Sequence, residues 1–286
     1  MHDSTIFIID SSKRVSGTTS NFTYLINVPK GHDYDRVCVL QAIIPKSFYL
    51  VNSPYNTFTL LENGVSTLIT ITEGNYNAQS WITIIAALLT TSSSQGWTYT
   101  ISRPNAITQV DTGMFTYSVT GNSGNQPSII FPTSSQLYEQ FGFNYNSTNL
   151  FVSSSLTSSN IMKFQVEDVI FIHSNISANS DQSANNDVLQ EIYASSTPNY
   201  SNIIYQNSGC IEAYSKKLLS PENNIFSFIL TNESQLGINL RGLNCVITLI
   251  VYKKDNFNQL LAVNHLMNET NQMNQQNNPQ INNNLS

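Results

Sequence analysis

The chain has 286 residues and a formal net charge of −6, and only 10% of its residues are charged, against about 25% in a typical soluble protein. Its 14 Tyr and 14 Phe exclude a largely disordered chain, since disordered segments are poor in aromatic residues. The acidic balance and the lack of Lys/Arg clusters argue against direct binding of nucleic acid. A neutral polar surface favours association and fits a subunit packed against neighbours, although an AT-rich coding bias would also enrich Asn, Ile and Tyr.

The three cysteines, Cys38, Cys210 and Cys245, form no C-x-x-C pair. An odd number without such a pair predicts neither a disulfide framework nor a zinc site, and we expect a reducing compartment. The N-terminus has no long apolar stretch, so we expect no signal peptide. No run approaches 18 apolar residues, the length that a membrane span requires.

Strand patterns dominate the start of the chain. Runs rich in apolar and β-branched residues occur at residues 5–9, 22–28, 36–44, 56–62 and 66–72. Pro45 has no backbone N–H and therefore ends the third run. Asn63-Gly64 lies between the last two runs, and this pair favours the two positive φ angles of a type I′ turn. We therefore predict a hairpin centred on Asn63-Gly64.

A helix is expected at residues 77–92, with Asn77 as its N-cap. Apolar residues recur there at the helical period, namely Trp81, Ile84, Ile85, Leu88 and Leu89. Strand patterns resume after the helix, and a short helical turn is expected at 136–143. The later strands are expected at 97–102, 114–120, 128–131, 163–174, 188–195, 209–217, 224–231 and 244–253.

Many short strands with little helix indicate a sandwich or jelly roll. We predict an all-β fold: a single jelly-roll β-sandwich with a small inserted α+β subdomain and a polar C-terminal arm. The expected division is an N-terminal arm with the first strands at 1–30, the jelly roll at 31–72 and 156–255, the insertion at 73–155, and the tail at 256–286.

The tail is rich in Asn and Gln. Such a tract cannot bury enough apolar surface to fold alone. It is either a disordered end or an arm that orders along a neighbouring subunit. The apolar residues that could hold such an arm in place are Leu260, Leu261, Val263, Leu266 and Met267.

Motifs for catalysis and cofactor binding are missing from the sequence. The four histidines, His2, His32, His173 and His265, have no metal-binding spacing. No nucleophile elbow, P-loop or dinucleotide fingerprint occurs. We therefore expect no enzyme activity, no cofactor and no bound metal.

Sugar binding is an alternative function, because jelly rolls also occur in lectins and exposed aromatic rings stack on sugars. Trp97, Tyr99 and Tyr117 lie on strands of the expected insertion and are the candidates for an exposed surface there. The same residues also fit cross-strand aromatic packing inside the fold.

Six short motifs stand out between residues 11 and 143. They are S-x-x-R-x-x-G (Ser11 or Ser12, Arg14, Gly17), Asn21-Phe22, I-P-K-S-F-Y (Ile44 to Tyr49), N-T-F (Asn56 to Phe58), E-G-N-Y (Glu73 to Tyr76) and L-Y-E-Q-F-G-F (Leu137 to Phe143). Together they resemble the penton and minor capsid proteins of viruses with double-jelly-roll major capsids, which include virophages, polinton-like viruses and related giant viruses. Beyond about residue 145 only the rhythm of strands supports the resemblance.

The resemblance implies a penton subunit. Its jelly roll would stand upright in the shell, and five copies would close each icosahedral fivefold vertex among capsomers of the major capsid protein. It further implies assembly in the host cytoplasm, residence in the virion and contacts with minor capsid proteins. The insertion would project outward, where it could meet a host receptor or glycan. The alternatives are a minor capsid or cement protein on the inner side of the shell and, from another class, a carbohydrate-binding spike protein.

The candidates for contacts between subunits are Arg14, Asn21, Phe22, Phe48, Tyr49, Leu260 and Leu261. In a ring of five, one flank of each copy meets a different flank of the next copy. Neutral flanks with aromatic residues fit such contacts, because burying an unpaired charge costs free energy. Arg14 would contact a neighbour at the inner side of the capsid.

Overall fold

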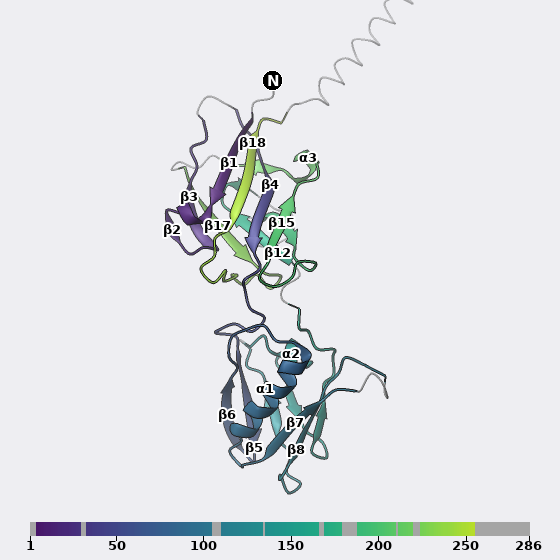
Figure 1. Ribbon diagram of the computed structural model, residues 1–286. Helices are drawn as coiled ribbons and strands as arrows, with labels where there is room; N and C mark the ends of the chain where they lie inside the picture. The colour runs from purple at the N-terminus through teal and green to yellow at the C-terminus, as the bar shows by residue number, and fades with distance from the viewer. Residues whose placement is uncertain are drawn as a thin grey trace, which may run out of the picture.

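Two separate hydrophobic cores form along the chain, and each lies in its own lobe (Figure 1). The computed structural model describes residues 4–29, 33–104, 110–133, 135–165, 169–178, 188–209, 211–219 and 224–254. The first core joins residues from the two ends of the described chain, and we call its lobe the jelly-roll lobe. The second core is built from the middle of the chain, and we call its lobe the insert lobe.

The first sheet of the jelly-roll lobe is antiparallel throughout. Its strands, in spatial order, are β1 (Ser4–Asp10), β18 (Val246–Tyr252), β4 (Arg36–Pro45), β16 (Lys216–Leu218) and β13 (Ser177–Ala178), and β15 (Asn202–Gln206) pairs with β4 next to β16. Side chains alternate between the two faces of a strand, and β18 accordingly buries every second residue. One face of the sheet therefore covers the core and the other is the outer surface.

The second sheet closes the sandwich from the opposite side. Its antiparallel strands are β14 (Val188–Tyr193), β12 (Val169–Ser174), β17 (Ile225–Thr231), β3 (Asn21–Leu25) and β2 (Ser16–Gly17). Phe22 on β3 stacks on Phe228 on β17, with 5.6 Å between ring centroids. The short helices η1 (Ser11–Lys13) and α3 (Ile211–Tyr214) lie in the connections. The predicted all-β jelly-roll fold is confirmed.

The insert lobe holds two smaller sheets and a helix. One sheet has the order β10 (Thr148–Leu150), β9 (Ser128–Ile130), β5 (Thr57–Glu62), β6 (Val65–Thr70), and the other β11 (Ser155–Thr157), β8 (Thr116–Thr120), β7 (Thr98–Ser102). Helix α1 (Ala78–Thr91) packs into the core through Trp81, Ile85 and Leu89, and α2 (Tyr138–Phe141) is a single turn.

Local sequence patterns explain the start of α1 and the first hairpin. Asn77 Oδ1 accepts a hydrogen bond from the Ser80 backbone N–H at 2.9 Å, and Ser80 Oγ accepts one from the Asn77 N–H at 3.0 Å, which is a capping box. Asn63 and Gly64 both have positive φ, 46° and 81°, and join β5 to β6. The predicted helix, its cap and the hairpin are confirmed.

The extent of the inserted unit differs from the expectation that it begins at residue 73. The β5–β6 hairpin, expected in the jelly roll, pairs instead with β9, and the second core runs from Val51 to Met162. Alternating apolar residues show that a hairpin has a buried face, but they do not show which sheet its edge strand will join.

The first residues also differ from a free arm. β1 pairs with β18 along its whole length, from Ser4 opposite Tyr252 to Asp10 opposite Val246. The start and the end of the described chain therefore meet at the end of the jelly-roll lobe that points away from the insert lobe (Figure 1). The predicted tail at 256–286 lies outside the described residues.

Candidate functional site

Two side chains in the corner that follows β4, Lys46 and Ser47, form hydrogen bonds to loops of the jelly-roll lobe. Lys46 is buried, and its Nζ donates hydrogen bonds to the carbonyl oxygens of Ala194 and Thr197, both at 2.8 Å. Ser47 Oγ donates to the Leu240 carbonyl at 2.8 Å. A buried ammonium is costly unless its donors are used, so the Lys46 side chain holds this corner in one conformation.

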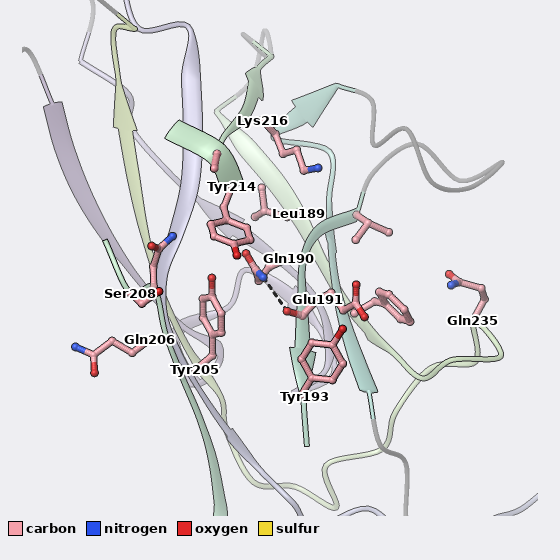
Figure 2. Close-up of a pocket in the computed structure, with 14 residues that line it drawn as sticks. Leu189, Gln190, Glu191, Tyr193, Tyr205, Gln206, Ser208, Tyr214, Lys216 and Gln235 are labelled. Atoms are coloured by element: carbon pink, nitrogen blue, oxygen red, sulfur yellow. Dashed lines mark hydrogen bonds between the residues drawn. The ribbon is translucent and has the colours of Figure 1, made fainter. Parts of the chain in front are cut away.

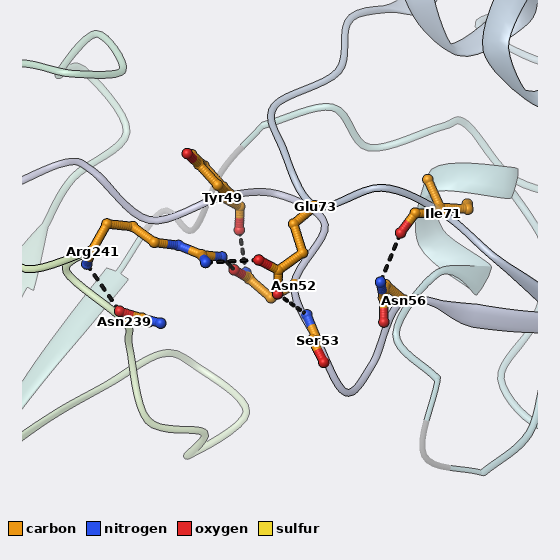
Figure 3. A network of polar contacts seen from close by, with 8 residues as sticks. All are labelled: Tyr49, Asn52, Ser53, Asn56, Ile71, Glu73, Asn239 and Arg241. Atoms are coloured by element: carbon orange, nitrogen blue, oxygen red, sulfur yellow. Dashed lines mark hydrogen bonds and ion pairs between the residues drawn. The ribbon is translucent and has the colours of Figure 1, made fainter.

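Arg241 joins the two lobes. Its Nη1 lies 2.7 Å from Glu73 Oε2 and its Nη2 lies 2.7 Å from Asn52 Oδ1, and its guanidinium carbon lies 4.2 Å from the centre of the Tyr49 ring. Figure 3 shows this set, which we call the arginine clamp: Arg241, Glu73, Asn52 and Tyr49. Arg241 comes from the loop before β18, whereas the other three flank the start and end of the β5–β6 hairpin.

Glu73 carries the charge that the clamp requires. Its Oε1 accepts the Ser53 backbone N–H at 2.8 Å, and this bond, together with the Arg241 guanidinium, holds the pKa of Glu73 below its ordinary value. Hydrogen bonds to an ionised carboxylate favour its charged form. The clamp is therefore a charge-assisted contact between the lobes at neutral pH.

Two asparagines of the same motifs complete the junction. Asn75 Oδ1 accepts the Leu50 N–H at 2.8 Å, and Asn75 Nδ2 donates to Tyr200 Oη at 3.2 Å. Asn56 is buried, and its Nδ2 donates to the Ile71 carbonyl at 2.7 Å. Residues of the I-P-K-S-F-Y and E-G-N-Y motifs thus meet between the lobes, whereas Asn56 of the N-T-F motif binds within the insert lobe.

Sequence reasoning missed Arg241 and Lys46 as positioning residues. Arg241 lies in a loop without periodicity, so no local pattern marks it. Lys46 and Glu73, however, lie inside motifs that were already singled out. A charged residue between apolar strand ends needs a partner when it is buried. The charges within these motifs therefore indicate polar contacts.

Three residues of the jelly-roll lobe that were predicted to contact other subunits differ in their burial. Phe22 and Phe48 are buried in the first core, so neither can touch another subunit and both are corrected to core residues. Aromatic residues are common at interfaces, but the inward side of a strand or corner uses the same residue type. Asn21 is exposed.

Arg14 and Tyr49 already have partners within the chain. Arg14 Nε donates to the Gly17 carbonyl at 2.8 Å and Arg14 Nη1 to the Ser11 carbonyl at 2.9 Å, which closes the loop after β1. Tyr49 is half-buried beneath Arg241 in the clamp. Leu260 and Leu261 lie outside the described residues.

The aromatic candidates for an exposed sugar-binding surface are corrected as well. Trp97, Tyr99 and Tyr117 are only 5%, 2% and 0% exposed and belong to the second core. Tyr99 Oη donates to Glu62 Oε1 at 2.7 Å and Tyr117 Oη to the Phe141 carbonyl at 3.2 Å. Strand alternation separates two faces but does not say which one is buried. These rings cannot stack on a sugar.

Glu62 is a buried carboxylate that no local sequence pattern indicates. It is 0% exposed at the end of β5. Its oxygens accept hydrogen bonds from Ser93 Oγ (2.8 Å), Ser94 Oγ (3.0 Å), Tyr99 Oη (2.7 Å) and the Gln95 N–H (3.3 Å). Burial and the neighbouring carboxylate raise the pKa of Tyr99. Glu62 therefore ties the connection between α1 and β7 to the edge of the hairpin.

The outer face of the first jelly-roll sheet is largely uncharged. Ile8 on β1 is 65% exposed and Ile204 on β15 is 66% exposed. The register places Thr248 opposite Ile8 and Gln41 opposite Thr248. We call this surface the outer sheet face: Ile6, Ile8, Gln41, Ile43, Ile204, Gln206, Val246, Thr248 and Ile250. Exposed aliphatic side chains spread over neighbouring strands are typical of a surface that contacts another protein.

A pocket of about 610 Å³ opens beside this face, between β14 of the second sheet and β15 of the first (Figure 2). Tyrosine and amide side chains line it, together with one carboxylate and one ammonium. Its lining includes Gln190, Glu191, Tyr193, Tyr205, Tyr214 and Lys216.

His173, Cys38 and Cys245 are buried in the jelly-roll lobe. No group of three His, Cys, Asp or Glu residues that could hold a metal occurs there. His173 is buried, with its Nε2 2.8 Å from Thr231 Oγ1. Burial raises the pKa of the Cys38 and Cys245 thiols to about 11 in each case, so both are protonated at neutral pH. None of the described helices has the length and apolar character needed to cross a membrane.

Comparisons with known proteins show no family for this chain. No protein-family model matches the sequence, and no curated protein matches it. Among solved structures, the selenomethionine-labelled mavirus penton protein is 12% identical, with a TM-score of 0.43 over 88% of this chain and 99% of that chain. The STIV MCP is 13% identical, with a TM-score of 0.12 over 90% of this chain and 99% of that chain. Both TM-scores lie below 0.5, so neither likeness establishes a fold or a function.

Proposed function

We propose that this chain is a structural protein of a viral capsid, and specifically a penton subunit that forms homopentamers at the fivefold vertices. The observation that carries the proposal is the arginine clamp, in which Arg241 of the jelly-roll lobe binds Tyr49 and Glu73, each from a different penton-like motif. These residues position a jelly roll and an inserted lobe relative to each other, which a subunit needs when one lobe sits in a shell and the other projects from it. The role requires no reacting group.

The arrangement of the lobes supports an orientation in the shell. Both described ends of the chain lie at the end of the jelly-roll lobe opposite the insert lobe (Figure 1). We infer that the insert lobe projects outward, and that the end with Ser4 and Lys254 faces the interior. Partners in this arrangement are sibling subunits, the major capsid protein and minor capsid proteins. Assembly would take place in the host cytoplasm.

The outer sheet face supports lateral packing. Its exposed isoleucines and neutral polar residues can be buried without the cost of desolvating unpaired charge. In a closed ring this face of one copy would meet a different flank of the next copy. Ile8 and Ile204 lie on different strands of this face and are suitable positions at which to test it.

The experiment is the measurement of assembly by light scattering and native mass spectrometry, with the full chain alone and with the major capsid protein. We expect a species of five times the 31.9 kDa chain mass. Ile8→Lys together with Ile204→Lys should abolish it, whereas Leu68→Lys, at an exposed position of the insert lobe, should leave it intact. A chain that remains monomeric under both conditions contradicts the penton role. A position under the shell, away from the fivefold axes, would favour a cement protein.

A further inference from the structure

The larger sheet of the insert lobe ends in two open edges. Its order is β10-β9-β5-β6, and within the described residues β6 pairs only with β5 and β10 pairs only with β9. Both edge strands lie inside continuously described stretches, 33–104 and 135–165. Figure 1 shows β6 at the margin of the lobe. The sheet can therefore be extended by another strand on either side.

The backbone groups at both edges are those that a further strand would use. In an antiparallel ladder, alternate residues exchange hydrogen bonds with the neighbouring strand, and the residues between them point their N–H and C=O groups the other way. The Ile71 N–H donates to the Asn56 carbonyl at 2.9 Å, and the Phe151 N–H donates to the Pro127 carbonyl at 3.0 Å. Alternation from these bonds directs outward the backbone groups of Ser66, Leu68 and Thr70 on β6 and of Thr148 and Leu150 on β10.

β6 lacks the features that usually protect an edge strand from pairing, which are charged side chains, proline, bulges and short length. Its sequence is VSTLIT, and its register with β5 runs over all six residues without a shift. Leu68 is 66% exposed and Val65 is 46% exposed. β10 is shorter, with the sequence TNL, but it is also uncharged, and Leu150 is 54% exposed. Such edges indicate that another strand covers them.

A second copy of the same sheet fits both edges. β5 and β10 run in one direction and β6 and β9 in the other, because each neighbouring pair is antiparallel. Rotation about an axis along the strands preserves these directions, so β6 of one copy would meet β10 of the next copy in antiparallel orientation. The outward residues also share the outer face of the sheet, since the register across it runs from Leu68 through Thr59 and Ile130 to Thr148.

We propose that the insert lobes of neighbouring copies join by strand pairing, with β6 of one copy antiparallel to β10 of the next. The register that places Leu68 opposite Leu150 of the next copy also places Thr70 opposite Thr148, so the two exposed leucines cover each other and no charge is buried. The contact is heterologous, because it uses two different edges, and it can continue around a ring. It rests on the proposed penton role and adds to it. The outer sheet face holds the jelly-roll lobes together, so loss of the strand pairing leaves the ring closed.

Cysteine cross-linking in the full chain tests this pairing. Leu68→Cys and Leu150→Cys are combined in one chain, and a short bismaleimide is added under conditions in which pentamers form. We expect a ladder of covalent species that ends at five chains on a denaturing gel. Each single variant, which controls for the native cysteines, should give at least about tenfold less product, since a heterologous contact does not bring two β6 strands together. Cross-linked dimers from Leu68→Cys alone would overturn the proposal in favour of a symmetric β6–β6 contact.

The matched control pair combines Leu68→Cys with Ile161→Cys. Ile161 is 69% exposed and lies beside Gly113, which precedes β8 of the other sheet in the insert lobe. This pair has the same number of exposed thiols but does not join the two edges, so we expect no more product than from the single variants. Equal yields from the two pairs would contradict the assignment of β10 as the partner of β6.

Hydrogen exchange provides a second readout, which depends on the backbone bonds. In the pentamer, the amides of Leu68 and Thr70 should exchange at least about tenfold more slowly than in the monomeric variant with Ile8→Lys and Ile204→Lys. The Ile69 amide bonds to β5 and should be equally protected in both. Pentamers that lack both the cross-links and this protection would overturn the edge pairing and leave the penton role intact, whereas a chain that forms no pentamers contradicts both.

Discussion

The two lobes are stabilised in different ways. The jelly-roll lobe has long strand pairs and a mainly aliphatic core, whereas the insert lobe has short strands and an aromatic core. At the centre of the insert lobe, Phe141 lies 4.8 Å from Phe58, 5.0 Å from Trp81 and 5.2 Å from Phe131, measured between ring centroids. Where sheet hydrogen bonding is limited, the packing of large rings supplies the burial that stabilises the fold.

The lobes can be followed separately, because both tryptophans, Trp81 and Trp97, lie in the insert lobe. Tryptophan fluorescence therefore reports on that lobe, and hydrogen exchange of β4 and β18 reports on the other. The stability of each lobe can therefore be measured separately in single-substitution variants.

The largest effect is expected from Phe141→Ala. Removing a buried ring from the centre of the aromatic cluster should cost about 4 kcal/mol, and the tryptophan-detected unfolding transition should shift accordingly. Phe226→Ala, in the jelly-roll core, is the matched control and should affect mainly the exchange of β4 and β18. Equal shifts of both probes in both variants would mean that the lobes form one cooperative unit.

Glu62→Ala should cost about 3 kcal/mol, because it leaves buried donors without an acceptor. The donors are the Tyr99 hydroxyl, two serine hydroxyls and the Gln95 N–H. Urea unfolding followed by tryptophan fluorescence measures the loss. Ser66→Ala, at an exposed position on β6 of the insert lobe, should change stability little. A comparable loss in the two variants would refute the structural role of Glu62.

Arg241→Ala should loosen the junction more than it unfolds either lobe. The lost contacts are charge-assisted but partly exposed, so the expected cost is about 1–2 kcal/mol. Small-angle X-ray scattering should show a wider distribution of lobe positions. Arg241→Lys keeps the charge but cannot form the two-pronged contact, and it should resemble the alanine variant. An unchanged scattering profile in both variants would show that the clamp does not fix the lobes.

The smallest effect concerns pH. The pKa of Glu73 lies below its ordinary value of 4.5, so the unfolded state binds more protons than the folded state as the pH falls. The stability that Glu73 contributes is therefore complete above about pH 4.5 and is lost as the pH falls through the lowered value. The difference in unfolding free energy between the wild type and Glu73→Gln should shrink across that range. A difference that is independent of pH would contradict the ionised clamp.

Local features of this chain could be predicted from its sequence, and long-range ones could not. The Asn63-Gly64 turn and the Asn77 cap depend on neighbouring residues only, and both form as predicted. The sheet that the β5–β6 hairpin joins depends on β9, more than fifty residues away. The burial of Trp97 and the pairing of Arg241 with Glu73 likewise depend on distant partners, which spacing within one strand or loop does not reveal.

In the proposed vertex role, the jelly-roll lobe sits in the shell at the fivefold axis and the insert lobe projects from it. Cryo-electron microscopy of intact particles, with copy number measured by quantitative mass spectrometry, tests it most directly. We expect five copies around each fivefold axis, with the β5–β6 hairpin on the outer side. Density for the chain between the capsomers and the particle interior, or particles that lack the chain, would contradict it.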